Sequence, residues 1–173
     1  CKKFKVLCKH PAPGLKSKSS VIERKIGVAL QGVRALLATG NLPNCFRPFA
    51  GHVFAFHSCL FSKNPRTPAP YTRVTGEVRD FKTFTLGCSV FFKPAPTILS
   101  CAKTDNPLRP GIFLDYYIGL DGRFTKQYIV CDLEDFVNKN LYYRTSAENF
   151  KLHLHRTEVV RHPVGATYPI YPL

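Results

Sequence analysis

The sequence predicts an α+β fold, with one N-terminal helix packed on a curved, mostly antiparallel sheet and a short second helix near residues 132–141. Three observations support this prediction. A long apolar stripe of helical period occupies residues 21–38, aromatic and β-branched runs separated by Pro and Gly follow it, and an Asp-Gly pair divides the runs at 112–118 and 124–131. The 173 residues are most simply one domain, ending in an extended tail at 162–173.

The predicted helix has signals at both ends. Ser20 and Glu23 form a capping box, in which each side chain accepts a hydrogen bond from an exposed amide, and Gly40 is the stop signal. Gly27 and Gly32 each weaken a helix by up to ~1 kcal/mol relative to Ala, so either they permit close packing on the sheet or the helix is marginal. The apolar stripe consists of Ile22, Ile26, Ala29, Val33, Leu36 and Leu37.

The Asp-Gly pair at 121–122 predicts a β-hairpin with a two-residue turn. Both central residues of that turn need positive φ, which Gly adopts freely and Asp tolerates. Counting outward from the turn pairs Ile118 with Thr125, and it pairs Ile112 with Cys131 at the far end. Both faces of this hairpin are half apolar, so we expect it to lie inside a larger sheet.

Further strands are predicted where β-branched and aromatic residues form short runs bounded by Pro or Gly. These runs are residues 2–9, 52–61, 71–78, 81–92, 98–102 and 150–160. In the short helix, Asp132 is the expected cap, Glu134 and Asp135 lie in the first turn, and Lys139 lies near the end. This order of charges suits the helix dipole.

The chain is strongly basic, with 25 Lys and Arg residues against 11 Asp and Glu residues and a net charge of +14. Such a surface attracts polyanions, RNA among them, although it also serves solubility alone. Nine of the basic residues lie in the first 34 positions, opposed only by Glu23. If the first strand and the helix are neighbours, they form one patch that contacts several phosphates. The nine residues are Lys2, Lys3, Lys5, Lys9, Lys16, Lys18, Arg24, Lys25 and Arg34.

The seven cysteines include no Cys-x-x-Cys pair, which argues against a zinc ribbon or a redox dithiol. Their number allows three disulfides and one free thiol, or seven reduced thiols. The sequence begins at Cys1, contains no Met and has no apolar run of ~18 residues that could span a bilayer. We therefore expect a secreted protein without its signal peptide, whereas reduced cysteines would point to the cytoplasm. No motif indicates a metal or another cofactor.

Two short motifs suggest an alternative, catalytic function. Residues 155–157 (His-Arg-Thr) have the form His-x-Thr, and residues 57–59 (His-Ser-Cys) differ from it by a Cys in place of the hydroxyl. With both motifs on strands, they resemble the two-histidine phosphoesterases, which act on 2′,3′-cyclic or 2′-5′ phosphodiesters. The resemblance implies that His57 and His155 serve as general base and general acid and that Thr157 binds phosphate.

A second resemblance concerns the hairpin and the start of the chain. The Pro-Gly pair at 110–111, the apolar strand, the turn at 121–122 and the following strand resemble the core of small fungal secreted ribonucleases. Residues 4–8 (FKVLC), the amphipathic helix and the Pro-bearing loop are similar to the ribonuclease-like effectors that plant-pathogenic fungi secrete. The resemblance covers residues 4–42 and 110–150, about half of the chain.

At the positions where this resemblance implies catalytic residues, the sequence departs from the family. The catalytic Arg position falls at Leu114 and Asp115, and the catalytic His position falls at residues 130–132 (Val-Cys-Asp). The catalytic Glu is expected around residues 84–92, which contain no carboxylate. Because transesterification needs a base, an acid and a cation on the phosphate, the resemblance implies a relative without catalysis.

Three hypotheses therefore stand. The leading one is a secreted, basic, ribonuclease-like protein of effector type, which binds RNA or a host protein without turnover. The second is the two-histidine phosphoesterase. The third is a viral capsid or nucleocapsid subunit, suggested by positive charge and Phe- and Tyr-rich strands, although the long helix argues against it.

Overall fold

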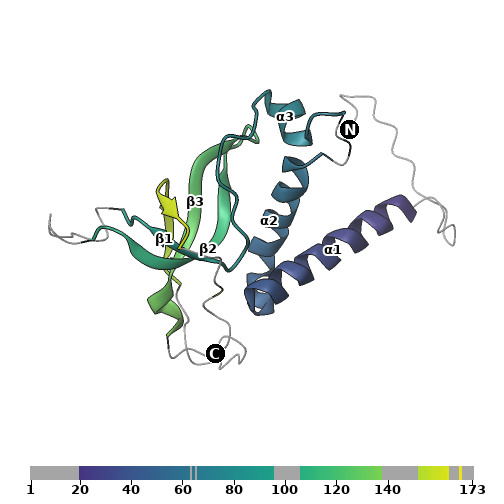
Figure 1. Cartoon of the computed structure of the whole chain (residues 1–173). Coiled ribbons are helices and arrows are strands. Elements are labelled where there is room, and N and C mark those ends of the chain that lie inside the picture. Colours follow the sequence, from purple (N-terminus) through teal and green to yellow (C-terminus); the bar gives the residue numbers. More distant parts are fainter. Residues whose placement is uncertain are drawn as a thin grey trace, which may run out of the picture.

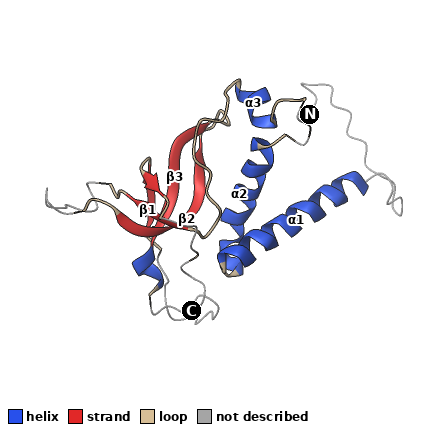
Figure 2. Cartoon of the chain, viewed as in Figure 1, coloured by secondary structure: helices blue, strands red, loops and turns tan. Residues whose placement is uncertain are grey.

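The computed structural model describes residues 20–62, 64, 66–95, 106–137, 152–163 and 168. The α-helices gather on one side of the molecule and the strands on the other, with one 3₁₀ turn at 133–136 on the strand side, which confirms the predicted α+β class (Figure 2). Residues 2–9 and 98–102, both predicted as strands, lie outside the described residues, as does most of the predicted C-terminal tail.

The described helices precede the strands along the chain (Figure 1). The helical elements are α1 (Ser20–Gly40), the 3₁₀ turn η3 (Asn44–Phe46), α2 (Arg47–Leu60) and α3 (Pro70–Thr75). The strands are β1 (Ser89–Phe92), β2 (Arg109–Ile118), β3 (Phe124–Asp132), β4 (Leu154–Thr157) and β5 (Val160–Arg161), with the 3₁₀ turn η4 (Leu133–Phe136) after β3. Within the described part of the chain, no helix is both long and apolar enough to cross a bilayer.

The predicted N-terminal helix is confirmed as α1. It packs mainly on α2, and α2 in turn lies against β2 (Figure 1). Gly32 is needed at the crossing of the two helices, because a Cβ there would lie 2.0 Å from Cε2 of Phe54. A Cβ on Gly27 would meet nothing within 4 Å. Close packing therefore explains Gly32, but the element packed against it is α2 and not the sheet.

The prediction of strands at 52–61 and 71–78 is wrong, since both regions contribute helices. In α2 the buried residues follow helical spacing, and they are Ala50, Val53, Phe56 and Leu60. Pro48 lies in the first turn of this helix, where its missing N–H costs nothing. α3 likewise begins at Pro70, and Gly76 ends it with φ of 74° and an N–H bond to Thr72 O at 2.9 Å.

The strand predicted at 81–92 forms only over its last four residues, as β1. Alternate apolar residues of this segment are buried, and they are Phe84, Leu86, Cys88, Val90 and Phe92. The chain turns at Gly87, where φ is 81° and the amide of Cys88 bonds to Thr85 O at 3.1 Å. The backbone of Phe84 pairs with a side chain, the hydroxyl of Tyr116, in place of a neighbouring strand.

The β2–β3 hairpin is confirmed, but its turn differs from the predicted one. Gly119 pairs with Arg123 across a three-residue loop in which Gly122 has φ of 78°, as in a type I turn followed by a bulge. Two register shifts follow, and the prediction of Ile118 opposite Thr125 is wrong because Ile118 lies opposite Phe124. The shifts compensate, so the predicted pairing of Ile112 with Cys131 at the far end is correct.

The predicted final strand at 150–160 is divided into β4 and β5, which lie at opposite edges of the sheet. The strand order is β4-β3-β2-β1-β5, with every pairing antiparallel. One continuous segment of chain, 154–161, therefore joins both edges. At the join, Thr157 Oγ1 donates to Lys93 O at 2.9 Å, and Lys93 N donates to Val159 O at 3.3 Å. The sheet is thus curved into a nearly closed, barrel-like form.

The short helix predicted near 132–141 is present as the 3₁₀ turn η4, and residues 138–141 lie outside the described residues. Asp132 makes no side-chain cap, since its carboxylate lies against the Nε2 of His155 at 3.1 Å. Asp135 accepts a hydrogen bond from the amide of His153 at 2.7 Å, so acidic groups of this turn hold the residues leading into β4.

Candidate nucleic-acid interface

The basic patch predicted from the first 34 residues is described only in part. Arg24, Lys25 and Arg34 are exposed on α1. The other six residues of the patch, Lys2, Lys3, Lys5, Lys9, Lys16 and Lys18, lie outside the described residues. The patch as a whole therefore stays a prediction.

A second basic surface, which the sequence did not indicate, lies on β1 and β5. Phe91 is 39% exposed and lies opposite Arg161 of β5 in the strand register. Lys93 follows two residues after Phe91, so both side chains leave the same face. Val159 is 41% exposed and faces Lys93 across the join of the sheet. We call these four residues the β1–β5 surface.

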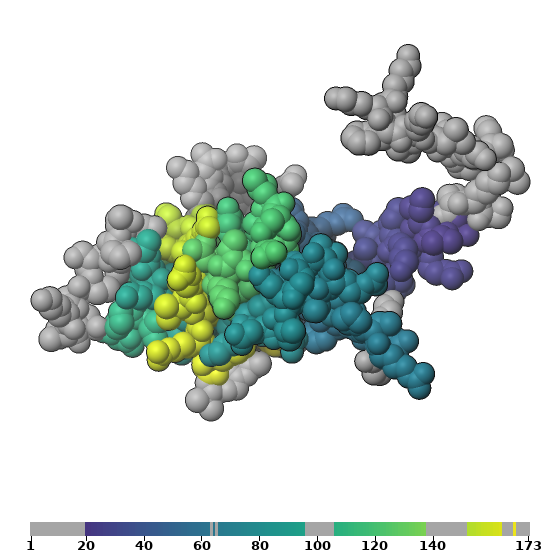
Figure 3. All heavy atoms as spheres, turned by 90° about the horizontal axis from the view of Figure 1, so that it is seen from above, coloured from purple at the N-terminus to yellow at the C-terminus, as the bar shows by residue number. Residues whose placement is uncertain are grey.

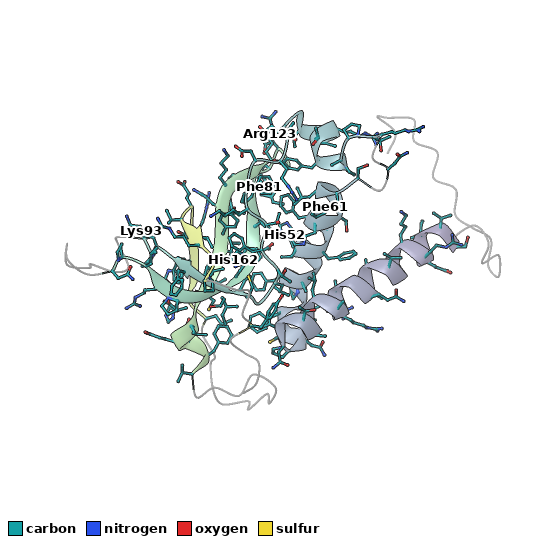
Figure 4. All side chains as sticks on the ribbon, viewed as in Figure 1. His52, Phe61, Phe81, Lys93, Arg123 and His162 are labelled. Carbon is teal, nitrogen blue, oxygen red and sulfur yellow. The ribbon has the colours of Figure 1, made fainter. Side chains whose placement is uncertain are left out.

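The two cations of the β1–β5 surface have no carboxylate partner in the part of the chain that the structure describes. Among the described residues neither Lys93 nor Arg161 forms an ion pair. Arg123, in contrast, pairs with Glu77 at 3.1 Å and lies 3.6 Å from Asp121. Lys93 lies at the end of the molecule opposite α1 (Figure 4). The β1–β5 surface therefore presents unneutralised positive charge beside an exposed aromatic ring.

A second arginine on the sheet, Arg156, differs because its guanidinium already contacts other residues of the protein. The guanidinium carbon of Arg156 lies 3.4 Å from the centre of the Tyr117 ring, and its Nε donates to Gln127. Gln127 in turn donates to Glu158 at 2.9 Å. This guanidinium is stacked and hydrogen-bonded within the protein, so it is less available to a ligand than that of Arg161.

His52 and His57 both lie on α2 and face β2, where each binds a buried polar group. His52 Nδ1 donates to the carboxylate of Asp115, 2.7 Å from Oδ1. His57 Nε2 lies 3.0 Å from the hydroxyl of Tyr116. That hydroxyl also accepts from Phe84 N at 2.7 Å and donates to Phe84 O at 3.0 Å. Since the hydroxyl has only one proton, His57 must be the donor in its own bond.

Burial shifts the pKa values of this group. Burial raises the pKa of Asp115, and the hydrogen bonds from His52 and from the amide of Tyr116 offset only part of that rise. Burial, together with the nearby Arg79 charge, lowers the pKa of His57. Burial also raises the pKa of Tyr116, so its hydroxyl keeps its proton. The group therefore serves to join α2 to the sheet.

The structure places His57 and His155 in different surroundings. His57 lies on a helix, whereas the phosphoesterase hypothesis required it on a strand. His155 lies in β4, is 4% exposed and packs on Phe92, with ring centres 5.0 Å apart. Its Nε2 bonds to Asp132, and its buried Nδ1 has no hydrogen-bond partner among the residues that the structure describes. The hydroxyl of Thr157 is occupied by Lys93 O at the join of the sheet. These contacts give the phosphoesterase hypothesis no support.

The positions at which the ribonuclease resemblance implies catalytic residues are buried or already hydrogen-bonded within the protein. Leu114, Val130 and Cys131 are fully buried. Asp115 is held by His52, and Asp132 by His155. Four of these residues are therefore buried, and Asp132 lines a cavity beside β4 with its carboxylate bound to His155.

A cavity of about 520 Å³ lies beside β4, lined by histidines and carboxylates that already pair with one another. His153 Nδ1 lies 3.0 Å from Asp135 Oδ1. Burial alone would raise the pKa of Asp135, but its hydrogen bonds with His153 outweigh burial and lower that pKa. In the described part of the chain, no three His, Cys, Asp or Glu side chains are arranged to hold a metal ion.

Four cysteines are described, and Cys59, Cys88 and Cys131 are free thiols. Cys45 and Cys59 are exposed, whereas Cys88 and Cys131 are buried. Burial raises the pKa of Cys88 to about 12 and also raises the pKa of Cys131. Cys1, Cys8 and Cys101 lie outside the described residues, so a disulfide among them stays open.

No protein-family model matches this chain, and comparisons with curated proteins and with solved structures find no match. The chemistry of its surfaces is therefore the basis on which a function can be proposed.

Proposed function

We propose that this protein is a non-catalytic binding module whose ligand is single-stranded RNA, held on the β1–β5 surface. One observation carries the proposal, namely that the partly exposed ring of Phe91 lies in a surface with two cations, Lys93 and Arg161, that have no ion pair among the described residues. Secretion, an effector role and a ribonuclease-like ancestry stay predictions from the sequence.

The chemistry of single strands matches this arrangement. Unpaired bases stack on aromatic side chains with little regard to sequence, at about 1–3 kcal/mol per base, while Lys and Arg beside the ring bind the phosphates. Lys93 and Arg161 lie on neighbouring strands in diagonal positions, which places them about 7–8 Å apart at the backbone. A net charge of +14 adds long-range attraction for a polyanion. A duplex hides its base faces, so the exposed ring favours a single strand.

The test is the affinity of the whole chain for a labelled single-stranded RNA of mixed sequence, measured by fluorescence anisotropy over a range of salt concentrations. Phe91→Ala should weaken binding by about 5- to 150-fold at one salt concentration, the equivalent of one lost stack. The double variant Lys93→Gln with Arg161→Gln should lower the salt slope by about 1.4, the value for two phosphate contacts.

Two further double variants remove the same charge elsewhere. Arg47→Gln with Arg66→Gln changes two exposed arginines outside the surface and should leave the salt slope nearly unchanged. Arg24→Gln with Lys25→Gln tests the patch predicted on α1. Loss of binding in this last variant alone would move the contact to α1 and refute the β1–β5 surface. Absence of any salt-dependent binding would refute RNA as the ligand and leave a host protein to be sought.

A further inference from the structure

α1 has an apolar face that the described protein covers over only half of its length. In the second half of the helix, Val33 and Leu37 are buried. In the first half, Ile22 is 64% and Ile26 is 54% exposed, although both continue the same helical stripe. Figure 3 shows why, because the purple first half of α1 stands out from the body of the molecule.

A cleft of about 600 Å³ opens where α1 diverges from α2. Val28 and Ala29 line it from α1, Phe54 lines it from α2, and Phe61 lines it just after the end of α2. Val28 is 53% and Phe61 is 56% exposed, so the apolar lining is open to solvent. The cleft and the exposed stripe meet on α1 and form one apolar groove, which we call the α1–α2 groove.

The charged side chains that line the cleft of the α1–α2 groove, among the described residues, have one sign. Lys25 lines it from α1 and Arg73 lines it from the opposite wall. No described side chain of the lining is a carboxylate. Arg79 adds a third cation next to the groove, because its guanidinium carbon lies 5.1 Å from the centre of the Phe61 ring. An apolar floor between cations is complementary to an apolar stripe between anions.

We propose that the α1–α2 groove binds an amphipathic α-helix of a partner protein, with acidic residues along both edges of its apolar stripe. Such a helix presents apolar side chains every three or four residues, and the exposed stripe of α1 has the same spacing at Ile22, Ile26 and Ala29. Its Asp and Glu side chains meet Lys25 and Arg73 on the two walls.

A second copy of this chain fits less well. Two copies would bring Arg24 and Lys25 of each α1 together, and each chain carries a net charge of +14. Like charges facing each other across an interface oppose association. RNA also fits poorly, since the groove is apolar over most of its lining and RNA is assigned above to the opposite end of the molecule.

The experiment uses two fluorescent synthetic peptides of 20 residues, each with Leu at helical i, i+3 and i+4 positions. One carries Glu and the other Lys at the flanking positions. The whole chain should bind the Glu peptide at least ~10-fold more tightly than the Lys peptide at low salt. Lys25→Glu with Arg73→Glu should reverse this preference. Ile26→Asp should lower the affinity for the Glu peptide by ~10-fold or more, because it places a charge in the apolar stripe of the groove.

Val78→Asp is the matched control, since Val78 is 80% exposed and lies outside the groove, and it should leave peptide affinity unchanged. Circular dichroism of each variant checks that α1 is intact, and a variant that loses helix is replaced by Val28→Ser. Equal binding of the two peptides, or an unreversed preference in the charge variant, would overturn the proposal. Concentration-dependent dimerisation that Ile26→Asp abolishes would assign the groove to a second copy. RNA affinity is measured on the same variants and should not change, so this proposal and the RNA proposal fail separately.

Discussion

The hydroxyl of Tyr116 offers a sharp test of how α2 and residues 84–88 are held to the sheet. The substitution Tyr116→Phe removes one oxygen and keeps the ring. The ring is 1% exposed and lies 4.8 Å from Phe56 and 4.9 Å from Phe113, measured between ring centres. Since these contacts stay, the change in stability reports the hydrogen bonds alone.

Three polar groups lose a partner in this variant. The N–H of Phe84 is left as an unpaired buried donor, which costs about 1–3 kcal/mol. The carbonyl of Phe84 loses its bond as well, at about 1 kcal/mol, while His57 is half-buried and can turn toward water. We therefore expect the free energy of unfolding to fall by about 3 kcal/mol, or roughly 10 °C in Tm for a chain of this size.

The measurement is urea unfolding followed by circular dichroism, with two matched variants. Tyr117→Phe alters the next residue, whose hydroxyl has no hydrogen bond within the described structure, and should change stability by less than ~0.5 kcal/mol. Tyr128→Phe removes one bond, from its hydroxyl to Lys82 O at 3.0 Å, and should cost about 1 kcal/mol. If Tyr116→Phe costs no more than Tyr117→Phe, the hydroxyl does not hold these elements together and the reasoning fails.

Two further predictions concern α1 and α2. Gly27→Ala should stabilise the protein by about 0.5–1 kcal/mol, because Ala has the higher helix propensity. Gly32→Ala should be less stable than Gly27→Ala by at least ~1 kcal/mol, because its Cβ would displace the ring of Phe54. The measurement is thermal unfolding of both variants, and equal shifts in Tm would contradict the close crossing of the helices. His57→Gln should flatten the loss of stability between pH 7 and pH 5. Burial and Arg79 lower the pKa of His57 in the folded state, so its stabilising effect is present above its unfolded pKa of 6.5 and is lost as pH falls through the folded pKa. Urea unfolding at both pH values measures this, and parallel losses in wild type and variant would count against it.

Local signals in the sequence were sufficient for α1 and for the β2–β3 hairpin. The capping box, the apolar stripe and the Gly stop of α1 lie within one segment, so they can be recognised without knowing the fold. The Asp-Gly turn was similarly informative, but it did not distinguish a two-residue loop from a three-residue loop. The difference arises because Leu120 belongs to the loop and the bulges beyond it restore the register.

α2 was mistaken for a strand because its residues favour both structures. Residues 52–61 contain three Phe and one Val, which favour a strand, but the buried residues at 50, 53, 56 and 60 have helical spacing. Pro48 near the start was an available signal for a helix. The error also affected the candidate site, because the phosphoesterase hypothesis required His57, like His155, to lie on a strand.

The β1–β5 surface could not be found from the sequence. Phe91 and Lys93 alternate with the buried Phe92, which predicts that they face outward. Arg161 lies 68 positions further along the chain than Lys93, and nothing local indicates that it pairs beside β1. The same is true of the α1–α2 groove, where Arg73 reaches a helix that began fifty residues earlier.

The amino-acid sequence by itself determined the positive charge, the long amphipathic helix, the hairpin and the α+β class, because each depends on composition or on the spacing of neighbouring residues. Only the tertiary structure decided that one segment joins both edges of the sheet, that His57 and His155 have different surroundings, and that the other described residues leave the first half of α1 uncovered. Strand order and burial depend on contacts between residues distant in the chain, and their free energies are set by packing and desolvation in the folded protein.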